Sequence, residues 1–313
     1  MASTEQTERG LKEYVLLGLK GFCMGAADVV PGVSGGTIAF ITGIYQELNE
    51  SIKSIEVQLV RQVLRFQWKA ALSQVGWSFL ATVLGGILVA IFSLAKGITW
   101  MLDNHPILTW AFFFGLVLAS VLTVSKRVNA GWGGLTYVAS GGGAVAAYLL
   151  VGLVPVETPN ALWFVFLSGL IAICAMILPG ISGSFLLVLM GKYQFLLAAV
   201  NNREGLVLGT FSLGAAIGIM SFARVLSWVF RRYHDLAIAL LTGLMVGSLR
   251  KVWPWKETLT TMLNRHGKEI PVLQVNIFPK SMTGEVALAV ALGGLGFVLV
   301  LALDRLAASK PEA

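Results

Sequence analysis

The chain of 313 residues is 56% hydrophobic and only 12% charged, and its mean hydropathy is +0.79. Soluble domains carry about one-quarter charged residues, so this composition excludes an ordinary soluble protein and indicates a membrane protein with several spans. The 23 Lys and Arg residues outnumber the 16 Asp and Glu residues, which gives a net charge of +7. In a membrane protein this excess indicates cytoplasmic loops and contact with anionic headgroups, so membrane lipids rather than nucleic acid are the predicted partners.

The first apolar tract, residues 14–48, is interrupted by the sequence Pro-Gly-Val-Ser-Gly-Gly at positions 31–36. The tract 161–200 is interrupted in the same way by Pro-Gly-Ile-Ser-Gly-Ser at positions 179–184. In lipid, the backbone groups freed by such a break must be satisfied by protein or must line a cavity. Each tract is therefore predicted to form a re-entrant helical hairpin with its turn deep in the membrane. The alternative is a pair of ordinary spans joined by a tight surface turn.

The connection after the first tract, residues 51–69, has apolar residues such as Ile52 and Ile55 at helical spacing, with Arg61 and Arg65 on a separate face. This pattern predicts an amphipathic helix, which either lies on the membrane interface or serves as a solvated connector. A spanning helix needs about 20 mainly apolar residues. The predicted spans are residues 77–95, 107–125, 135–155, 206–230, 235–249 and 285–303.

A second repeat supports internal symmetry, because Gly-Leu-Val-Leu-Ala-Ser at 115–120 resembles Gly-Leu-Met-Val-Gly-Ser at 243–248. Each half of the chain, residues 1–156 and 157–313, then contains one broken tract and three spans. Whether a tract crosses the membrane twice or not at all, the number of crossings per half is odd. The two halves should therefore have opposite orientations. We predict an all-α polytopic fold of two inverted repeats, as in many secondary transporters, and the sequence leaves the oligomeric state open.

Positive charges predict the orientation of the chain in the membrane. The N-terminus, residues 49–75, the pairs at 126–127 and 231–232, and the C-terminus fall on one side, which the positive-inside rule makes cytoplasmic. Residues 250–282 should then be external, yet they are basic. Their cations are Arg250, Lys251, Lys256, Arg265, Lys268 and Lys280. Either the predicted orientation is wrong or these cations have a function outside the membrane.

The repeated turn has the chemistry of an anion site, because each copy opens a new helix with glycines and hydroxyls. Helix N-termini present unpaired N–H groups to anions, glycines allow close approach, and hydroxyls donate to phosphate oxygens. The candidate substrate-binding residues are Gly32, Ser34, Gly35, Gly36 and Thr37 in the first copy and Gly180, Ser182, Gly183 and Ser184 in the second. The alternative is that Ser34 and Ser182 only cap their own helices, while the glycines serve helix packing.

Ionisable residues inside membrane segments are functional candidates. Asp28 lies three residues before the first turn and is a candidate for proton or sodium coupling, or for accepting N–H groups freed by the break. Lys20 and Lys192 lie on the two tracts, where each either attracts a phosphate or extends its amine toward the interface. Arg250 and Lys251 adjoin two tryptophans at a helix end, which suits a lipid headgroup as well as the ordinary aromatic belt.

The same turn also satisfies the G-x-S-x-G pattern of serine hydrolases. A serine nucleophile needs a base within hydrogen-bond reach, and the three histidines, His105, His234 and His266, all fall in predicted loops. An intramembrane hydrolase is therefore the weaker alternative to a transporter. Cys23 and Cys174 lie in apolar segments and match neither a disulfide framework nor a metal site, so we predict no metal or cofactor.

Three segments together, residues 24–48, 175–194 and 243–256, resemble the bacterial PopT family of polyprenyl-phosphate transporters. The resemblance runs over nearly the whole chain. It implies a protein of the bacterial cytoplasmic membrane that returns undecaprenyl phosphate, the carrier lipid of cell-wall synthesis, from the outer to the cytoplasmic leaflet. The residues alone show no particular lipid, and they leave a small-solute or ion transporter as the alternative.

Overall fold

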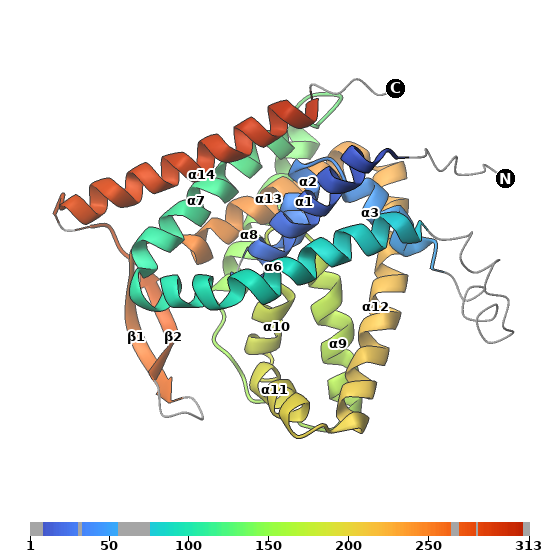
Figure 1. Cartoon of the computed structure of the whole chain (residues 1–313). Helices are drawn as coiled ribbons and strands as arrows, with labels where there is room; N and C mark the ends of the chain where they lie inside the picture. Colours follow the sequence, from blue (N-terminus) through green and yellow to red (C-terminus); the bar gives the residue numbers. More distant parts are fainter. Residues whose placement is uncertain (1–8, 31–32, 56–75, 264–268, 280, 309–313) are drawn as a thin grey trace, which may run out of the picture.

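The computed structural model describes residues 9–30, 33–55, 76–263, 269–279 and 281–308 (Figure 1). Within these ranges the chain forms twelve helices and one two-stranded β-hairpin. Five helices are long and apolar enough to cross a membrane, which agrees with the predicted multi-pass protein. They are α6 (Trp77–Asn104), α7 (Pro106–Ser125), α8 (Gly134–Val151), α12 (Gly205–Arg232) and α14 (Gly284–Ala308).

The span predicted at 235–249 is helical but differs from these five. It corresponds to α13 (His234–Val252), in which every window of 18 residues contains Asp235, Arg250 and Lys251. These charges leave α13 outside the group of candidate spans. Its middle is buried against α7 and α8, so α13 lies within the bundle and presents little surface to lipid.

Each broken tract consists of three helices where the sequence predicted a two-armed hairpin. The first contains α1 (Leu11–Asp28), α2 (Gly35–Ile41) and α3 (Tyr45–Lys53), and the second contains α9 (Leu162–Ile177), α10 (Gly183–Leu189) and α11 (Tyr193–Asn201).

A second break follows the repeated turn at Gly43 and at Gly191, whose φ angles are +76° and +65°. This left-handed conformation favours glycine. The 102° bend of the second tract lies at this later break, between α10 and α11, and forms one re-entrant-like pair.

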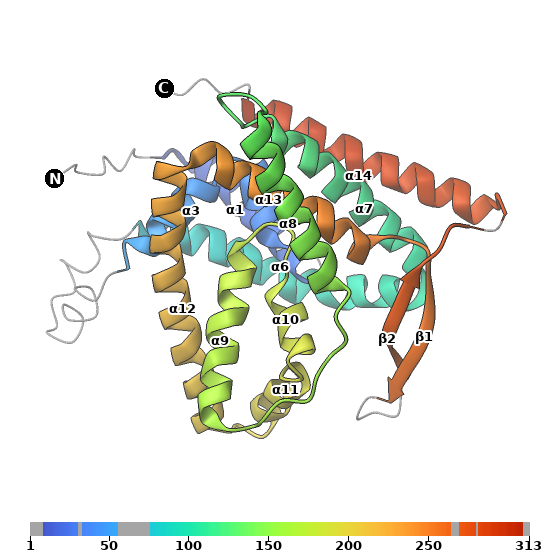
Figure 2. The same cartoon turned by 180° about the vertical axis from the view of Figure 1, so that it is seen from behind.

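The helices associate in close pairs through glycine. A Cβ atom on Gly115 of α7 would overlap the carbonyl group of Gly293 in α14, and one on Gly243 of α13 would overlap that of Ser140 in α8. These are the first residues of the two GL-x-x-x-S repeats. Small residues allow membrane helices to approach at backbone distance. Both views show α7 beside α14 and α8 beside α13 (Figures 1 and 2).

The short helix α2 lies at the centre of the molecule, since all seven of its residues are buried. Around it, a continuous apolar core includes Val33, Ile41, Val124 and Met245 from α2 and its neighbours. The described part of the first repeated turn, residues 33–36, is therefore enclosed by protein. This enclosure satisfies the requirement that irregular backbone at membrane depth be shielded from lipid.

The basic segment 250–282 contains a β-hairpin that the sequence prediction missed. Strand β1 (Lys256–Leu263) pairs antiparallel with β2 (Glu269–Asn276), and Lys256 faces Asn276 in the register. The hairpin projects from the end of α13 (Figure 1). The predicted interfacial helix at 51–69 lies mostly outside the described residues, which include only its first part, to residue 55.

The helix pairing predicts opposite effects for two glycine variants. Gly243→Ala should destabilise the protein by about 1–3 kcal/mol, because the new methyl group overlaps the backbone of α8. Gly142→Ala, on an open face of the same α8, should have no cost or a small gain from helix propensity. Thermal melting of the two purified variants in detergent measures the difference. Equal melting temperatures would contradict the close packing of α13 on α8.

Candidate functional site

The two repeated turns contact one another. The backbone N–H of Gly180 donates to Thr37 Oγ1 at 3.2 Å. Ser34 Oγ lies 3.3 Å from the carbonyl oxygens of both Met176 and Leu178. Its hydroxyl therefore donates its single proton to this pair of acceptors at the end of α9. Segments 142 to 144 residues apart in the chain are thus joined at one place. The two repeated turns therefore meet in the structure.

At the first turn, the protein's own side chains accept the backbone N–H groups that begin α2. Asp28 Oδ1 accepts the backbone N–H of Gly35 at 2.7 Å, and Ser34 Oγ accepts that of Gly36 at 3.1 Å. A carboxylate therefore already lies at the N-terminus of α2, where an anion would bind. This placement favours the reading of Asp28 as an acceptor for freed backbone groups. Gly32 lies outside the described residues.

The second turn differs because Met176 stands at the position equivalent to Asp28. Ser182 Oγ and Ser184 Oγ lie 2.8 Å apart, and the side chain of Ser182 makes no capping bond to α10. Two hydroxyls that bond to each other use one proton between them, so one O–H remains able to donate. The second turn therefore has donors without a built-in anion.

Close packing also requires glycine at two positions of the second turn. Gly180 has φ +86°, and a Cβ there would meet the backbone of Met245 and the hydroxyl of Ser248 on α13. Gly183 lies against the carbonyl oxygen of Ala172 on α9. Both glycines bring the turn into contact with its neighbours.

The paired cations at the end of α13 point in different directions. The Nζ atom of Lys251 lies 4.8 Å from the ring centroid of Phe185, the residue after Ser184, so Lys251 adjoins the second turn. Arg250 instead donates to the carbonyl oxygen of Tyr148 at 2.9 Å, and its Cζ atom lies 4.3 Å from the centroid of the Tyr148 ring. The structure thus brings Lys251 to the turn and ties Arg250 to α8.

Lys20 and Lys192 lie at the second breaks and away from the repeated turns. Lys20 Nζ donates to the carbonyl oxygen of Thr42 at 2.7 Å, directly before Gly43. Lys192, which is 1% exposed, donates to the carbonyl oxygen of Thr158 at 2.8 Å and to Asn160 Oδ1 at 2.7 Å. Each amine therefore has intramolecular acceptors, which for Lys192 lie in the segment between α8 and α9.

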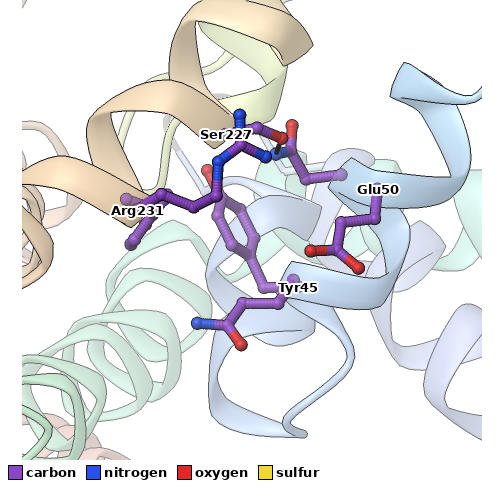
Figure 3. Close-up of a pocket in the computed structure, with 7 residues that line it drawn as sticks. Tyr45, Glu50, Ser227 and Arg231 are labelled. Atoms are coloured by element: carbon purple, nitrogen blue, oxygen red, sulfur yellow. Dashed lines mark hydrogen bonds between the residues drawn. The ribbon is translucent and has the colours of Figure 1, made fainter. Parts of the chain in front are cut away.

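Sequence reasoning missed a pocket of about 160 Å³ between α3 and α12. Tyr45 and Glu50 line it from one side, and Ser227 and Arg231 from the other (Figure 3). The hydroxyl of Tyr45 also donates to the carbonyl oxygen of Ile177 at 3.1 Å, which links this pocket to the end of α9. Tyr45 and Tyr193 stand at corresponding positions of the two tracts, and this repetition was the available sequence signal.

The serine-hydrolase alternative finds no support in the described residues. The ring of His105 makes an edge contact with that of Trp100 at the junction of α6 and α7, and His234 bonds to Asp235 at the start of α13. No described histidine hydrogen-bonds to Ser34 or Ser182, and His266 lies outside the described ranges. The hydroxyl of Ser34 is committed to backbone carbonyl groups.

Comparison with known proteins agrees with this picture. Residues 24–270 match the family model described as undecaprenyl phosphate translocase-like. The chain is 45% identical over 306 residues to a polyprenyl-phosphate transporter of Vibrio cholerae, covering 94% of this chain and 97% of that protein. It is 32% identical over 262 residues to a polyprenyl-phosphate transporter of Staphylococcus aureus, with 78% and 88% covered. No solved structure shows a significant match. The chain belongs to the undecaprenyl phosphate translocase-like family.

Proposed function

We propose that this protein transports polyprenyl phosphate across a membrane and returns undecaprenyl phosphate from the outer to the cytoplasmic leaflet for cell-wall polymer synthesis. The similarity to the Vibrio cholerae transporter over 94% of the chain carries the proposal. The geometry agrees with it, because two hydroxyl-bearing turns meet inside an apolar helical bundle. Translocation of a phosphate headgroup needs such a polar site, since charge is costly inside a membrane.

We also propose that residues 1–156 and 157–313 are inverted repeats. The supporting observation is that corresponding helices have matching lengths, with 7 residues in α2 and α10, 9 in α3 and α11, and 28 in α6 and α12. The pairing of α1 with α6 corresponds to that of α9 with α12, and the pairing of α7 with α14 corresponds to that of α13 with α8. Such an arrangement suits a substrate site at the interface between the repeats.

The proposed location is the bacterial cytoplasmic membrane, with both termini in the cytoplasm. Asp235 supports placing the basic pairs at 126–127 and 231–232 on one side. Its carboxylate accepts the backbone N–H groups of Asn129 and Ala130 at 3.0 and 2.8 Å. The loop after α7 therefore lies beside the start of α13, and the positive-inside rule makes this side cytoplasmic.

In our proposal the phosphate binds at the second turn. Ser182 and Ser184 retain a free O–H, Lys251 adds a positive charge nearby, and the position of Asp28 is taken by Met176. At the first turn the Asp28 carboxylate would repel a phosphate. The first turn then serves to hold the second in place, through the contacts of Ser34 with α9.

The orientation predicts which engineered cysteines can be labelled. In a background with Cys23→Ala and Cys174→Ala, Met282→Cys should react with an impermeant thiol reagent in intact spheroplasts, because residue 282 is 90% exposed and external. Ala130→Cys, in the exposed cytoplasmic loop, should react only after the membrane is opened. Mass spectrometry of the purified variants measures the labelling. The reverse pattern would overturn the proposed orientation.

Transport predicts the behaviour of the carrier lipid in cells. Depletion of this protein, in a host without another such transporter, should raise surface-exposed undecaprenyl phosphate, because its return to the cytoplasmic leaflet stops. A fluorescent headgroup-binding antibiotic measures the surface lipid. Complementation with the wild type or with Gly142→Ala should restore the normal level, since Gly142 faces open space.

Two results would separate the alternatives to this function. An unchanged level of surface lipid after depletion would contradict carrier-lipid transport and favour a small-solute or ion transporter.

We propose a proton or sodium gradient as the second partner. Adding an ionophore to complemented cells should then raise the surface lipid as depletion does. If the ionophore left the surface lipid unchanged, the proposal of transport would stand and the proposal of a coupling ion would be rejected.

The asymmetry of the turns predicts different defects for their serines. The double variant Ser182→Ala and Ser184→Ala should lower transport of a fluorescent short-chain polyprenyl phosphate in proteoliposomes by about tenfold, through loss of a donor to phosphate. Ser34→Ala should mainly lower the melting temperature, because it costs about 0.5–1.5 kcal/mol of bonding to α9. A double variant with full transport would argue against phosphate binding at the second turn.

A further inference from the structure

Two lysines come together where α13 gives way to the β-hairpin. Lys256 Nζ donates to the backbone carbonyl oxygen of Lys251 at 2.6 Å and lies 4.0 Å from the ring centroid of Trp110 on α7. Lys251 Nζ lies over Phe185 of α10. Both lysines are partly buried. The two positive charges thus lie at one junction, between the second turn and the hairpin.

No carboxylate of the described residues forms an ion pair with either lysine. Their surroundings are ring faces and a backbone carbonyl group, which attract a cation but do not neutralise it. Partly buried like charges are costly unless an opposite charge is present. Burial, together with the positive charge of Lys251, lowers the pKa of Lys256 to about 7. Within the described residues, no carboxylate therefore balances the charge of the two lysines.

Two tryptophans, Trp253 and Trp255, lie in the short segment of chain between the two lysines. The ring centroid of Trp253 lies 5.3 to 5.8 Å from the ring centroids of Phe114, Trp255 and Phe278. The indole N–H of Trp253 donates to the carbonyl oxygen of Ile277. The indole N–H of Trp255 is buried and has no acceptor among the described residues. A buried donor without an acceptor costs about 1–3 kcal/mol, and an acceptor bound to the Trp255 N–H would remove this cost.

We propose that Lys251 and Lys256 form the capture site for the phosphate headgroup of the lipid, with the Trp255 N–H as an additional donor. The inference rests on the proposed transport of polyprenyl phosphate and on an external hairpin. A phosphate held there contacts Lys251, which adjoins Phe185, and can pass from it to Ser182 and Ser184. Arg250, committed to Tyr148, is excluded from the site.

This assignment changes the pair of cations that the sequence suggested. Spacing along the chain pairs Arg250 with Lys251, whereas the fold pairs Lys251 with Lys256. The change has a physical basis, because residues adjacent on a helix lie about 100° apart around its axis. The chain after α13 then turns back so that Lys256 reaches the carbonyl oxygen of Lys251.

The test is binding of farnesyl phosphate to the purified full chain in detergent, with farnesol and inorganic phosphate as comparison probes. Lys251→Gln and Lys256→Gln should each weaken binding of farnesyl phosphate about tenfold to a hundredfold, since each removes a charged donor. Arg250→Gln is the matched control and should change the affinity less than twofold. Calorimetric titration gives the affinities, and thermal melting checks the fold of each variant.

The outcomes separate the capture site from the proposed function. Wild-type affinity in both lysine variants, with farnesyl phosphate still preferred over farnesol, would overturn the capture site alone. A wild type that does not distinguish farnesyl phosphate from farnesol would overturn the proposed function and the capture site together. Displacement of farnesyl phosphate by equimolar inorganic phosphate would identify a site for free phosphate and overturn the lipid assignment.

Lys256→Arg provides a readout that does not depend on a loss of folding. Around Lys256, α13 contributes Lys251, α7 contributes Trp110 and β2 contributes Asn276, so Lys251 is its titratable neighbour on these elements. An amine with a pKa of about 7 loses its charge as pH rises from 7 to 9, and a bound anion favours the charged form. Wild-type affinity should therefore fall by up to about tenfold per pH unit.

The arginine of Lys256→Arg stays protonated, so the fall in its affinity from pH 7 to 9 should be shallower than in the wild type. The second ionisation of a phosphate ester, near pH 6, is almost complete over this range and does not mimic the effect. An equally steep fall in Lys256→Arg would overturn the role of Lys256.

Discussion

The structure depends on one constraint, the need to satisfy backbone groups where a helix breaks inside an apolar core. A single broken helix cannot do this alone, because its freed carbonyl and N–H groups have no water to bond. Here the two tracts supply partners for each other. Ser34 and Tyr45 of the first tract donate to carbonyl groups at the end of α9, and Thr37 accepts the N–H of Gly180. Each break is therefore tolerable because the other lies beside it, and the polar centre of the protein follows from this mutual dependence.

In the proposed mechanism, two turns of nearly the same sequence have different roles. The difference comes from one position, where Asp28 in the first copy corresponds to Met176 in the second. Asp28 fills the start of α2 with the protein's own negative charge, while the start of α10 keeps hydroxyl donors without one. In this proposal, one copy of the motif stabilises the fold and the other copy binds the headgroup. The substitution of a single charged side chain is enough to separate the two roles.

Much of the architecture could be predicted from the sequence, because hydropathy and helix-breaking residues act locally. The long spans and the paired turns follow from these signals. The second breaks at Gly43 and Gly191 could not be predicted, since a glycine with positive φ and a glycine used in packing look alike in sequence. The β-hairpin was missed because its residues were counted only as a basic loop. The partners of Arg250 and Lys251 depend on the rotation of α13 against its neighbours, which only tertiary packing fixes.

The glycine contacts also limit how such a transporter can move. α7 of the first half lies at backbone distance from α14 of the second, and α8 of the first half lies equally close to α13 of the second. If the two halves of the chain rocked against each other as separate rigid bodies, both contacts would have to open, and each would expose a groove lined by backbone carbonyl groups. Alternating exposure of a headgroup is better served by units that combine helices from both halves. The mobile parts of this molecule would then not coincide with its repeats.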